Sequence, residues 1–524
     1  MAVNRPGVRV GGPAPATYSL CHHRRLPRRP VTRLRRERRG AGLGGLTLGA
    51  AVLRFATLGR QSFDHDEAVT AGRVLHPSLW HTLSVLPGSE RTPPLYYALG
   101  WGWSRLFGVH EAGLRSLSAL AGTLAVPLIF ASGRRLVSAR AGLAAALLAA
   151  VSPMLVYNGQ DARAYSLGIL LIALELLLFA RALERPAAGR LAGWALAASL
   201  AVATHYFTLF VSAPMAVWLV VRHRSRRGPR VAVAALGLAT VALAPLAYAQ
   251  AVSKATVSFA EGGLPRRVAV TAAAFAVGEN PPVPDASWLT VAFRATGVLV
   301  LGLAAGAVVL ALRAPDDHAR EGARLAFVVA AAGVLAPIGL AIVGLDFYNE
   351  RNVVFALVPL LVVTAAGTAR PDRRILGASL LGAVAALQLW VVVADVTASG
   401  LQRPAWRRLA GRIGRLRPDE AVVAPRTGDD PLAFYLHAAR MPKAGSRVRM
   451  IRIVDYAPYS DGTPEAVRRP PAGFRATGPR RLGPFSLYAL SSPRPRRISP
   501  DAVRREIAGA DAVLVPPPDG GLAK

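Results

Sequence analysis

The stretch Ser62-Phe63-Asp64-His65-Asp66-Glu67-Ala68 decides how the rest of this sequence is interpreted. Its four central residues are three carboxylates and an imidazole, and an apolar segment stands directly before it. Hydrocarbon does not tolerate this density of charge, so the stretch is expected just outside a bilayer. A carboxylate cluster held at a membrane face can bind a divalent cation or accept a proton from a nucleophile.

The composition indicates a membrane protein. Of the 524 residues, 52% are hydrophobic, and they form long runs of Ala, Leu, Val and Gly, many near the length that crosses ~30 Å of hydrocarbon. The net charge is +33, but the basic residues gather at the N-terminus, in short loops and near the C-terminus. This pattern suits the positive-inside rule better than nucleic-acid binding, which would favour a basic soluble face interleaved with aromatics, and only 7% of residues are aromatic. The single cysteine, Cys21, excludes an intrachain disulfide framework and a multi-cysteine metal site.

The basic N-terminus orients the chain. Residues 1–40 are predicted to be a disordered cytoplasmic tail, because nine arginines fall between Arg24 and Arg39. The first span, residues 41–58, then leads out of the cell and places residues 62–68 outside. Arginine-rich, alanine-rich composition hints at a GC-rich bacterial genome, so the membrane is predicted to be a bacterial plasma membrane.

The apolar piece that ends at Phe107 is too short to span comfortably, and its Tyr and Trp residues suit the interface. We interpret it as a helix on the outer membrane face. The alternative, a short true span, would place Arg134, Arg135 and Arg140 outside, against the charge rule.

With that choice, every strongly basic loop falls on one side of the membrane. We expect about eleven spans, each near the length that crosses the bilayer. They are residues 41–58, 114–136, 141–157, 165–183, 191–204, 207–221, 231–250, 288–312, 325–345, 353–369 and 375–394. The predicted fold is an all-α polytopic membrane domain, residues 41–394, with juxtamembrane helices in its first outer loop.

Residues 395–524 differ in composition, with shorter apolar runs and more Pro and Arg. They are predicted to form a small extracytoplasmic α/β domain, with strands at 421–425 and 512–516, a helix at 431–440 and a disordered tail from Pro516.

Ionisable residues gather in the predicted outer loops, whereas the inner loops offer mostly arginine. The candidates beyond Asp64, His65, Asp66 and Glu67 are Asp161, Arg163, His205, Tyr206, Glu279, Asn280, Asp346, Glu350 and Arg351. Each candidate residue also has a purely structural interpretation. Asp66-Glu67 can be a solvated loop, Asp161 and Arg163 an ion pair within a loop, His205 a polar cap, and Arg351 a snorkelling side chain. A guanidinium such as that of Arg351 also suits a lipid phosphate. The sequence has no Walker-type phosphate loop and no GxGxxG after a strand.

Five motifs occur in order over residues 45–215. They are Asp66-Glu67-Ala68, then Pro93-Pro94-Leu95-Tyr96-Tyr97 with Leu106-Phe107-Gly108, then Leu114-Arg115-Ser116-Leu117 with Gly133-Arg134-Arg135-Leu136, then Ser152–Tyr165, then Thr204-His205-Tyr206-Phe207. This pattern resembles the C-type, polyprenyl-phosphate-sugar-dependent membrane glycosyltransferases of family 39, the protein O-mannosyltransferase and aminoarabinose transferase group. Glu350-Arg351-Asn352 extends the match more weakly.

The resemblance implies inverting transfer of a sugar, mannose or another hexose or pentose, from a polyprenyl-phosphate carrier to an outer protein, lipid or cell-envelope glycan. It implies that Asp66 is the catalytic or metal-associated acid and that Glu67 is its partner. Asp64, which departs from the commoner motif, leaves open which aspartate is the base.

The same resemblance assigns further residues to substrate binding: Asp161, Arg163, His205, Tyr206 and Arg351, with Arg351 on the lipid phosphate. A divalent cation, Mg²⁺, Mn²⁺ or Zn²⁺, would lie on Asp66 and Asp161.

Two rival functions remain at this point. A transporter or lipid flippase should carry charged residues in mid-span, whereas the ionisable groups of this sequence lie mostly at the ends of spans and in loops, apart from Glu175. A structural envelope protein would use its C-terminal domain for a partner and would not need Asp66 or Asp161.

Overall fold

The structure is a computed structural model. It describes residues 29–253, 262–279, 288–398, 401–425, 427–456, 465–507 and 510–517. Residues 1–28 of the predicted tail, Asn280, and residues 518–524 of the predicted C-terminal tail lie outside these ranges. The chain divides into two compact units, Met1–Gly42 and Leu43–Lys524, and the contacts described below lie within the second.

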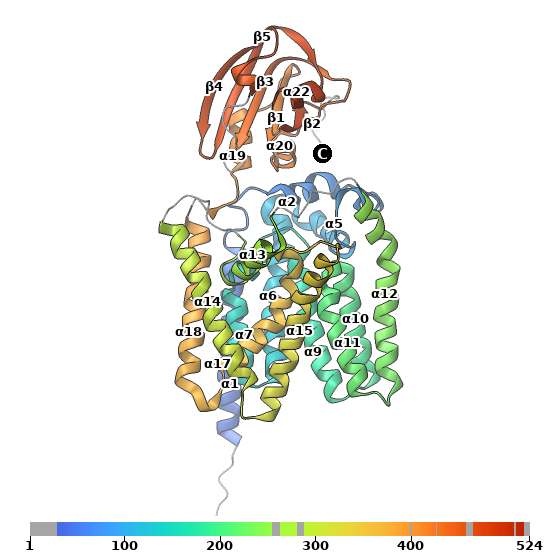
Figure 1. Cartoon of the computed structure of the whole chain (residues 1–524), viewed down its shortest axis with the longest axis vertical. Coiled ribbons are helices and arrows are strands. Elements are labelled where there is room, and N and C mark those ends of the chain that lie inside the picture. The colour runs from blue at the N-terminus through green and yellow to red at the C-terminus, as the bar shows by residue number, and fades with distance from the viewer. Residues whose placement is uncertain are drawn as a thin grey trace, which may run out of the picture. The chain divides into compact units, whose positions relative to one another are not determined.

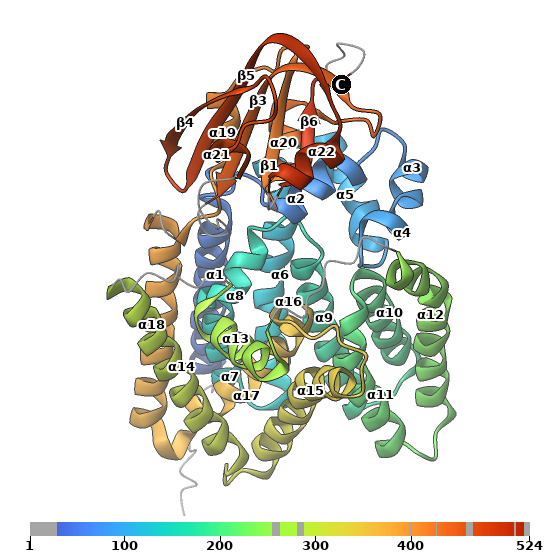
Figure 2. The ribbon, with the colours of Figure 1, turned by 45° about the horizontal axis from the view of Figure 1, so that its top comes forward.

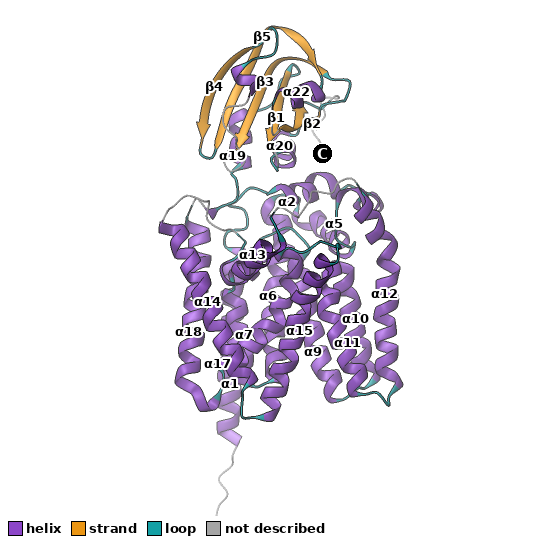
Figure 3. Ribbon diagram, viewed as in Figure 1, coloured by secondary structure: helices purple, strands orange, loops and turns teal. Residues whose placement is uncertain are grey.

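Helices make up the described chain as far as Thr397 (Figures 1 and 3). The longer ones are α1 (Arg29–Phe55), α5 (Leu95–Phe107), α6 (Glu111–Leu136), α7 (Ala139–Val151), α8 (Pro153–Gly159), α9 (Tyr165–Glu184), α10 (Ala188–Thr204), α11 (Leu209–Arg222), α12 (Arg227–Val252), α13 (Leu264–Val277), α14 (Trp288–Leu312), α15 (Asp317–Ile342), α17 (Leu357–Thr368) and α18 (Arg374–Thr397). The short ones are α2 (His65–Val69), the π-helix η1 (Thr70–Val74), α3 (Leu79–Ser84), α4 (Leu86–Ser89), α16 (Glu350–Val353) and the 3₁₀ turns η2 (Tyr206–Thr208), η3 (Val354–Ala356) and η4 (Pro371–Arg373).

These helices make the chain a multi-pass membrane protein. Among the described residues, seven helical segments are long and apolar enough to span a bilayer, and the number is eight if the bent pair α7–α8, with 58° between its halves, is one span. Shorter apolar helices cover residues 40–55, 188–204 and 206–222. Each predicted span therefore coincides with one of these segments, which confirms the predicted polytopic helical fold.

Two features differ from the sequence-based expectation. The first helix begins at Arg29, inside the segment predicted to be a disordered tail. A helix, α13, stands within residues 251–287, which the sequence predicts to be a long loop. Figure 2 shows α13 beside α16 and α8, with which it is in contact.

Loops that the sequence assigns to one side of the membrane contact one another. Arg135, in the last turn of α6, pairs with Glu184 at the end of α9, with Nη1 and Oε2 2.7 Å apart. The guanidinium of Arg370 donates to the carbonyl of Leu310 at 3.0 Å. The basic turns thus gather in neighbouring groups, as the predicted alternation of spans requires.

Small residues allow the helices to approach closely, as is common where lipid supplies no hydrophobic driving force between helices. A Cβ added at Gly367 on α17 would collide with the backbone of Ala307 on α14. A Cβ at Gly142 on α7 would likewise meet the backbone of Phe130 on α6. These glycines set the spacing of the inner helices, and α17 is largely buried as a result.

The C-terminal residues form an α/β domain, as predicted. Its six strands, in the order β2-β6-β1-β3-β5-β4, are β1 (Glu420–Pro425), β2 (Ala439–Arg440), β3 (Ser446–Tyr456), β4 (Arg475–Leu482), β5 (Phe485–Ile498) and β6 (Ala510–Val515). The helices of this domain are α19 (Trp406–Ile413), α20 (Asp429–Leu436), α21 (Glu465–Arg468) and α22 (Pro500–Glu506). β1 pairs in parallel with β3, and the other pairings are antiparallel. The helix predicted at 431–440 is shorter, because His437 adopts a left-handed conformation (φ 50°) and the chain continues into β2.

Candidate active site

Asp64 begins the short helix that carries the acidic stretch. Its Oδ1 accepts a hydrogen bond from the Glu67 N–H at 3.0 Å, and the Glu67 Oε2 accepts one from the Asp64 N–H at 3.1 Å. This reciprocal capping box satisfies two backbone donors that the first turn would otherwise leave unpaired. It also fixes the direction in which the intervening residues His65 and Asp66 project.

Glu67 is fully buried, and both of its carboxylate oxygens accept hydrogen bonds. Arg115 of α6 grips both of its oxygens, at 2.7 Å and 2.6 Å, and the Ala162 N–H donates to Oε1 at 2.8 Å. The guanidinium of Arg403, which follows α18, also donates to Oε2. Burial alone would raise the pKa of the Glu67 carboxyl, but Arg115 and Arg403 outweigh it and lower the pKa to about 2. Glu67 therefore stays ionised and joins three parts of the chain.

Asp66, its neighbour, is the accessible carboxylate of the stretch, with 39% of its side chain exposed. Its Oδ2 accepts a hydrogen bond from the Arg351 Nη1 at 2.9 Å. Its backbone carbonyl accepts one from the Arg163 Nη1 at 3.3 Å. Burial opposes ionisation, but the charges of Arg163, Arg351 and His65 prevail and lower the pKa of Asp66. The structure thus brings Asp66, Arg163 and Arg351 together.

Arg351 is held from its other side by a second carboxylate. Its Nε donates to the Oε2 of Glu279, just after α13, at 2.7 Å. Glu279 is 3% exposed, and burial raises its pKa to about 7 against the opposing charge of Arg351. Arg351 therefore bridges an exposed and a buried carboxylate.

Arg163 has its own buried partner, Glu90. The Arg163 Nη1 donates to the Glu90 Oε1 at 2.8 Å and to the Thr70 Oγ1 at 3.0 Å. Burial favours the neutral form of Arg163, but Glu90 and Asp66 raise its pKa well above the usual value.

Asp161 lies in a different group from Asp66. It is 1% exposed, and its Oδ1 lies 3.4 Å from the Arg403 Nη2. Burial raises the pKa of Asp161 well above its usual range, against the charge of Arg403. Ligand atoms of Asp64, Glu67 and Asp161 all lie within 4.8 Å of one another, a spacing that suits a metal ion. Asp66 belongs to neither of the two such groups found among the described residues, so the predicted pairing of Asp66 with Asp161 on a cation stays a prediction.

The second group joins α2 to the C-terminal domain. The His65 Nδ1 lies 3.3 Å from the Asp429 Oδ1 and 3.8 Å from the Asp430 Oδ2, both at the start of α20. Arg73 pairs with Asp430 and Arg440 with Asp429, so arginines already neutralise both aspartates.

Of the residues assigned to substrate binding by the resemblance, His205 and Tyr206 remain. His205 is buried between the rings of Tyr165 and Phe355, with centroids 5.5 Å and 4.9 Å away. Burial and then the charge of Arg163 lower the pKa of His205 to about 3, so it is neutral. Tyr206 lies outside these ion pairs and donates to the Gln250 Oε1 at 2.8 Å.

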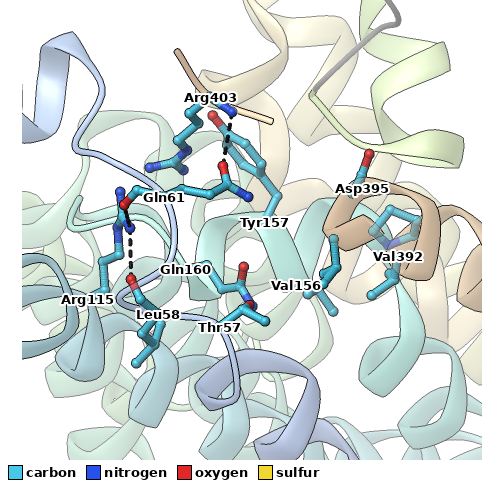
Figure 4. A pocket seen from close by; sticks show the side chains of 12 residues that line it. Thr57, Leu58, Gln61, Arg115, Val156, Tyr157, Gln160, Val392, Asp395 and Arg403 are labelled. Atoms are coloured by element: carbon cyan, nitrogen blue, oxygen red, sulfur yellow. Dashed lines mark hydrogen bonds between the residues drawn. The ribbon is translucent and has the colours of Figure 1, made fainter. Parts of the chain in front are cut away.

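A hollow opens beside the carboxylates, between the end of α1, α8 and α18 (Figure 4). Its polar lining includes Gln61, Tyr157, Gln160, Asp395 and Arg403. Figure 4 shows Arg403 above the hollow, with its backbone N–H bonded to Gln61 and its side chain beside Tyr157.

The sequence-based analysis missed Glu90, Arg115 and Arg403. Arg115 stands inside one of the quoted motifs, which is the one signal that could have identified it. Glu90 and Arg403 lie in polar segments where nothing in the local pattern distinguishes them.

Comparisons with known proteins agree with the resemblance drawn from the motifs. Residues 91–248 match the family described as dolichyl-phosphate-mannose-protein mannosyltransferase. No curated protein matches the sequence.

Among solved structures, ArnT from Cupriavidus metallidurans in the apo state has 15% sequence identity and a TM-score of 0.53, over 86% of this chain and 98% of that chain. The same enzyme bound to undecaprenyl phosphate has 14% identity and a TM-score of 0.52, over 85% and 97% of the two chains. The chain therefore has the ArnT fold, and the resemblance to C-type glycosyltransferases is confirmed.

Proposed function

We propose that this chain, which shares the ArnT fold, is an inverting membrane glycosyltransferase. It moves a sugar, mannose or another hexose or pentose, from a polyprenyl-phosphate carrier to an acceptor at the outer face of a bacterial plasma membrane. One observation carries this proposal. Asp66, Arg163 and Arg351 come from segments far apart in sequence and meet at one residue: Arg351 bonds the accessible carboxylate of Asp66, and Arg163 bonds its backbone carbonyl.

The reaction class follows from the charges. An accessible carboxylate can take the proton of an acceptor hydroxyl, and guanidinium groups bind phosphate oxygens in a bidentate manner. In support of a lipid-phosphate donor, ArnT of the same fold was solved with undecaprenyl phosphate bound. The alternative of a transporter or flippase gains no specific support from these contacts.

Asp66 suits the role of base better than Asp64. The Asp64 Oδ1 is occupied in capping α2, and its side chain is 19% exposed. Asp66 uses neither oxygen in a cap and is 39% exposed. We therefore assign the base to Asp66, with Glu67 as the buried residue that fixes the helix carrying it.

The proposed step is a single displacement. The acceptor oxygen attacks the anomeric carbon while its proton passes to Asp66, and the bond from that carbon to the phosphate oxygen breaks. The electron pair leaves with the polyprenyl phosphate, whose negative charge Arg351 and Arg163 stabilise. Binding of the donor phosphate to Arg351 would also release Asp66 from its ion pair and make it a stronger base.

A transfer assay in membrane vesicles tests the proposal. Vesicles with the wild-type chain, Asp66→Asn or Asp346→Asn receive a panel of radiolabelled polyprenyl-phosphate sugars. Asp346 is the matched control, because it is also an aspartate in a predicted outer loop but pairs with Arg267 instead. We expect label to reach an acceptor with the wild type and Asp346→Asn, and to fall by about 10²-fold or more with Asp66→Asn. Equal transfer by all three would refute the role of Asp66.

A further inference from the structure

We infer that this chain supplies its own cation at the carboxylate group of Asp64, Glu67 and Asp161. The guanidinium of Arg403 occupies the place that a divalent metal would take. The inference deepens the proposed function, since the group adjoins Asp66, but its main test is a binding measurement that needs no transfer activity.

The carboxyl groups of Asp64, Glu67 and Asp161 lie so close together that they can ionise only beside a cation. Their ligand atoms lie within 4.8 Å of one another, and Glu67 and Asp161 are buried. Like charges this close repel strongly where water is scarce. Arg115 compensates Glu67 through its two bonds, while burial raises the pKa of Asp161 well above its usual range and Arg403 opposes that rise, so the ionised carboxylates of the group have Arg403 as their second cation.

Arg403 provides that charge from the centre of the group. Its Nη1 donates to Glu67 and lies 3.9 Å from the Asp64 Oδ2, while its Nη2 lies 3.4 Å from the Asp161 Oδ1. A divalent ion would need carboxylate oxygens at about 2.0–2.6 Å in the same volume. The guanidinium and a metal ion therefore cannot both occupy the volume between the three carboxylates.

The side chain of Arg403 is fixed in this position. It is 6% exposed, and its guanidinium lies 4.8 Å from the ring centroid of Tyr157. Its backbone N–H donates to the Gln61 Oε1 at 3.0 Å (Figure 4). Contacts on three sides distinguish it from a surface arginine that pairs loosely.

Asp161 is the carboxylate that the loss of Arg403 would affect most directly. Its buried Oδ1 makes no hydrogen bond among the described residues, and Arg403 is the cation that lies beside it. Removal of the guanidinium would leave buried carboxylate oxygens without charge compensation, which is a ligand set that Mn²⁺ or Mg²⁺ prefers. The truncated variant should therefore gain a metal site that the native chain lacks.

Arg403 lies between the last membrane helix, α18, and the C-terminal domain. Four residues later, Arg407 fixes the same segment by donating to the Glu111 Oε1 at 2.8 Å and to the Gly59 carbonyl at 3.1 Å. The segment that connects α18 to the C-terminal domain thus brings the cation to the carboxylates.

The test measures Mn²⁺ binding to the purified full-length protein by electron paramagnetic resonance and calorimetry. The variants are wild type, Asp161→Asn, Arg403→Ala, Arg403→Lys, Arg403→Ala with Asp161→Asn, and Arg407→Ala. Arg407→Ala weakens the same anchoring segment but leaves the guanidinium among the carboxylates, so it controls for loosening of the domain. Gel filtration and thermal unfolding establish that each variant is folded.

We expect Arg403→Ala to bind about one Mn²⁺ per chain at least tenfold more tightly than the wild type. Wild type, Arg403→Lys and Arg407→Ala should lack this site, and Asp161→Asn should remove it from Arg403→Ala. A stoichiometric Mn²⁺ site in the wild type that Asp161→Asn abolishes would overturn the inference. So would a folded Arg403→Ala protein with no gain in Mn²⁺ binding.

A second arm separates this inference from the proposed function. If the wild type transfers sugar, a chelator should leave its rate unchanged, and loss of transfer on chelation would contradict a resident guanidinium. If no sugar is transferred under any condition, the proposed function fails while the Mn²⁺ result still decides the role of Arg403.

Discussion

Glu67 is bound by two guanidinium groups and a backbone N–H, whereas the adjacent Asp66 is 39% exposed and pairs with Arg351. Both residues lie in a five-residue helix that begins with a capping box. In this helix the Glu67 side chain faces the core, and the Asp66 side chain faces an accessible space. The motif and the family resemblance were enough to select Asp66 and Arg351 as candidates. They could not predict the burial of Glu67, because Arg115 and Arg403 lie 48 and 336 residues away in the sequence.

Replacement of these neighbours should affect different properties. Glu67→Gln leaves two buried arginines without full compensation, and we expect it to lower the free energy of unfolding by about 3–5 kcal/mol. Asp66→Asn alters an exposed pair and should change stability by about 1 kcal/mol or less. Thermal unfolding of the two purified variants makes the comparison. A Glu67→Gln protein as stable as the wild type would contradict the structural role given to Glu67.

At the scale of elements, each span predicted from hydropathy coincides with an apolar helix among the described residues, because a span needs a long apolar run whatever its neighbours are. It did not find α13, whose residues Leu264–Val277 contain two arginines and resemble an amphipathic loop segment. It also missed the bend between α7 and α8, where Ser152-Pro153 interrupts a continuous apolar run. The contacts of α13 with α8 and α16 are absent from any local pattern, whereas Ser152-Pro153 is a local signal for the bend that the hydropathy does not register.

Close helix packing gives a prediction at this scale. Gly367→Ala places a methyl group against the backbone of Ala307, which cannot move as a side chain can. We expect a loss of about 1–3 kcal/mol in the free energy of unfolding. Gly382→Ala on α18 is the control, since a Cβ there meets nothing within 4 Å. Equal unfolding temperatures for the two variants would show that α14 and α17 are not packed at this glycine.

The contact between α2 and α20 should depend on pH. Burial opposes protonation of His65, but its close pairing with Asp429 and the charges of Asp66 and Asp430 raise its pKa to about 9. Since this value is above that of an unfolded histidine, the stabilisation is complete below about pH 6.5 and is lost as the pH rises through 9.

Arg73 and Arg440 also face the two aspartates and do not titrate in this range, so His65 should dominate the change. We expect the wild type to be more stable than His65→Gln by about 1–3 kcal/mol at pH 6 and by much less at pH 10. Thermal unfolding of both proteins between these pH values tests this, and a constant difference would contradict it.

At the scale of the whole molecule, charge decided the predicted orientation, because basic loops remain on the cytoplasmic side. The contacts among the basic turns agree with that alternation, and the site residues meet at the other loops. The sequence could also predict an α/β domain at the C-terminus. It could not predict that the segment leading into this domain places Arg403 at the site, since no local pattern marks that arginine.

The orientation can be measured by cysteine labelling of whole cells with a membrane-impermeant maleimide. The natural cysteine, Cys21, should react only after the membrane is permeabilised, because the tail is predicted to be cytoplasmic. Ala444→Cys in a Cys21→Ser background should react in intact cells, since Ala444 is exposed in the C-terminal domain. The opposite pattern would invert the topology and place Asp66 in the cytoplasm.

The most direct test of the central claim compares the kinetics of Asp66→Asn and Arg351→Gln in the vesicle assay, with the donor that the wild type uses. If Asp66 is the base and Arg351 holds the donor phosphate, Asp66→Asn should lower kcat by about 10²-fold or more with little change in the donor KM. Arg351→Gln should raise the donor KM by about tenfold or more and also lower kcat. Wild-type kcat and KM in both folded variants would contradict the assignment of the site.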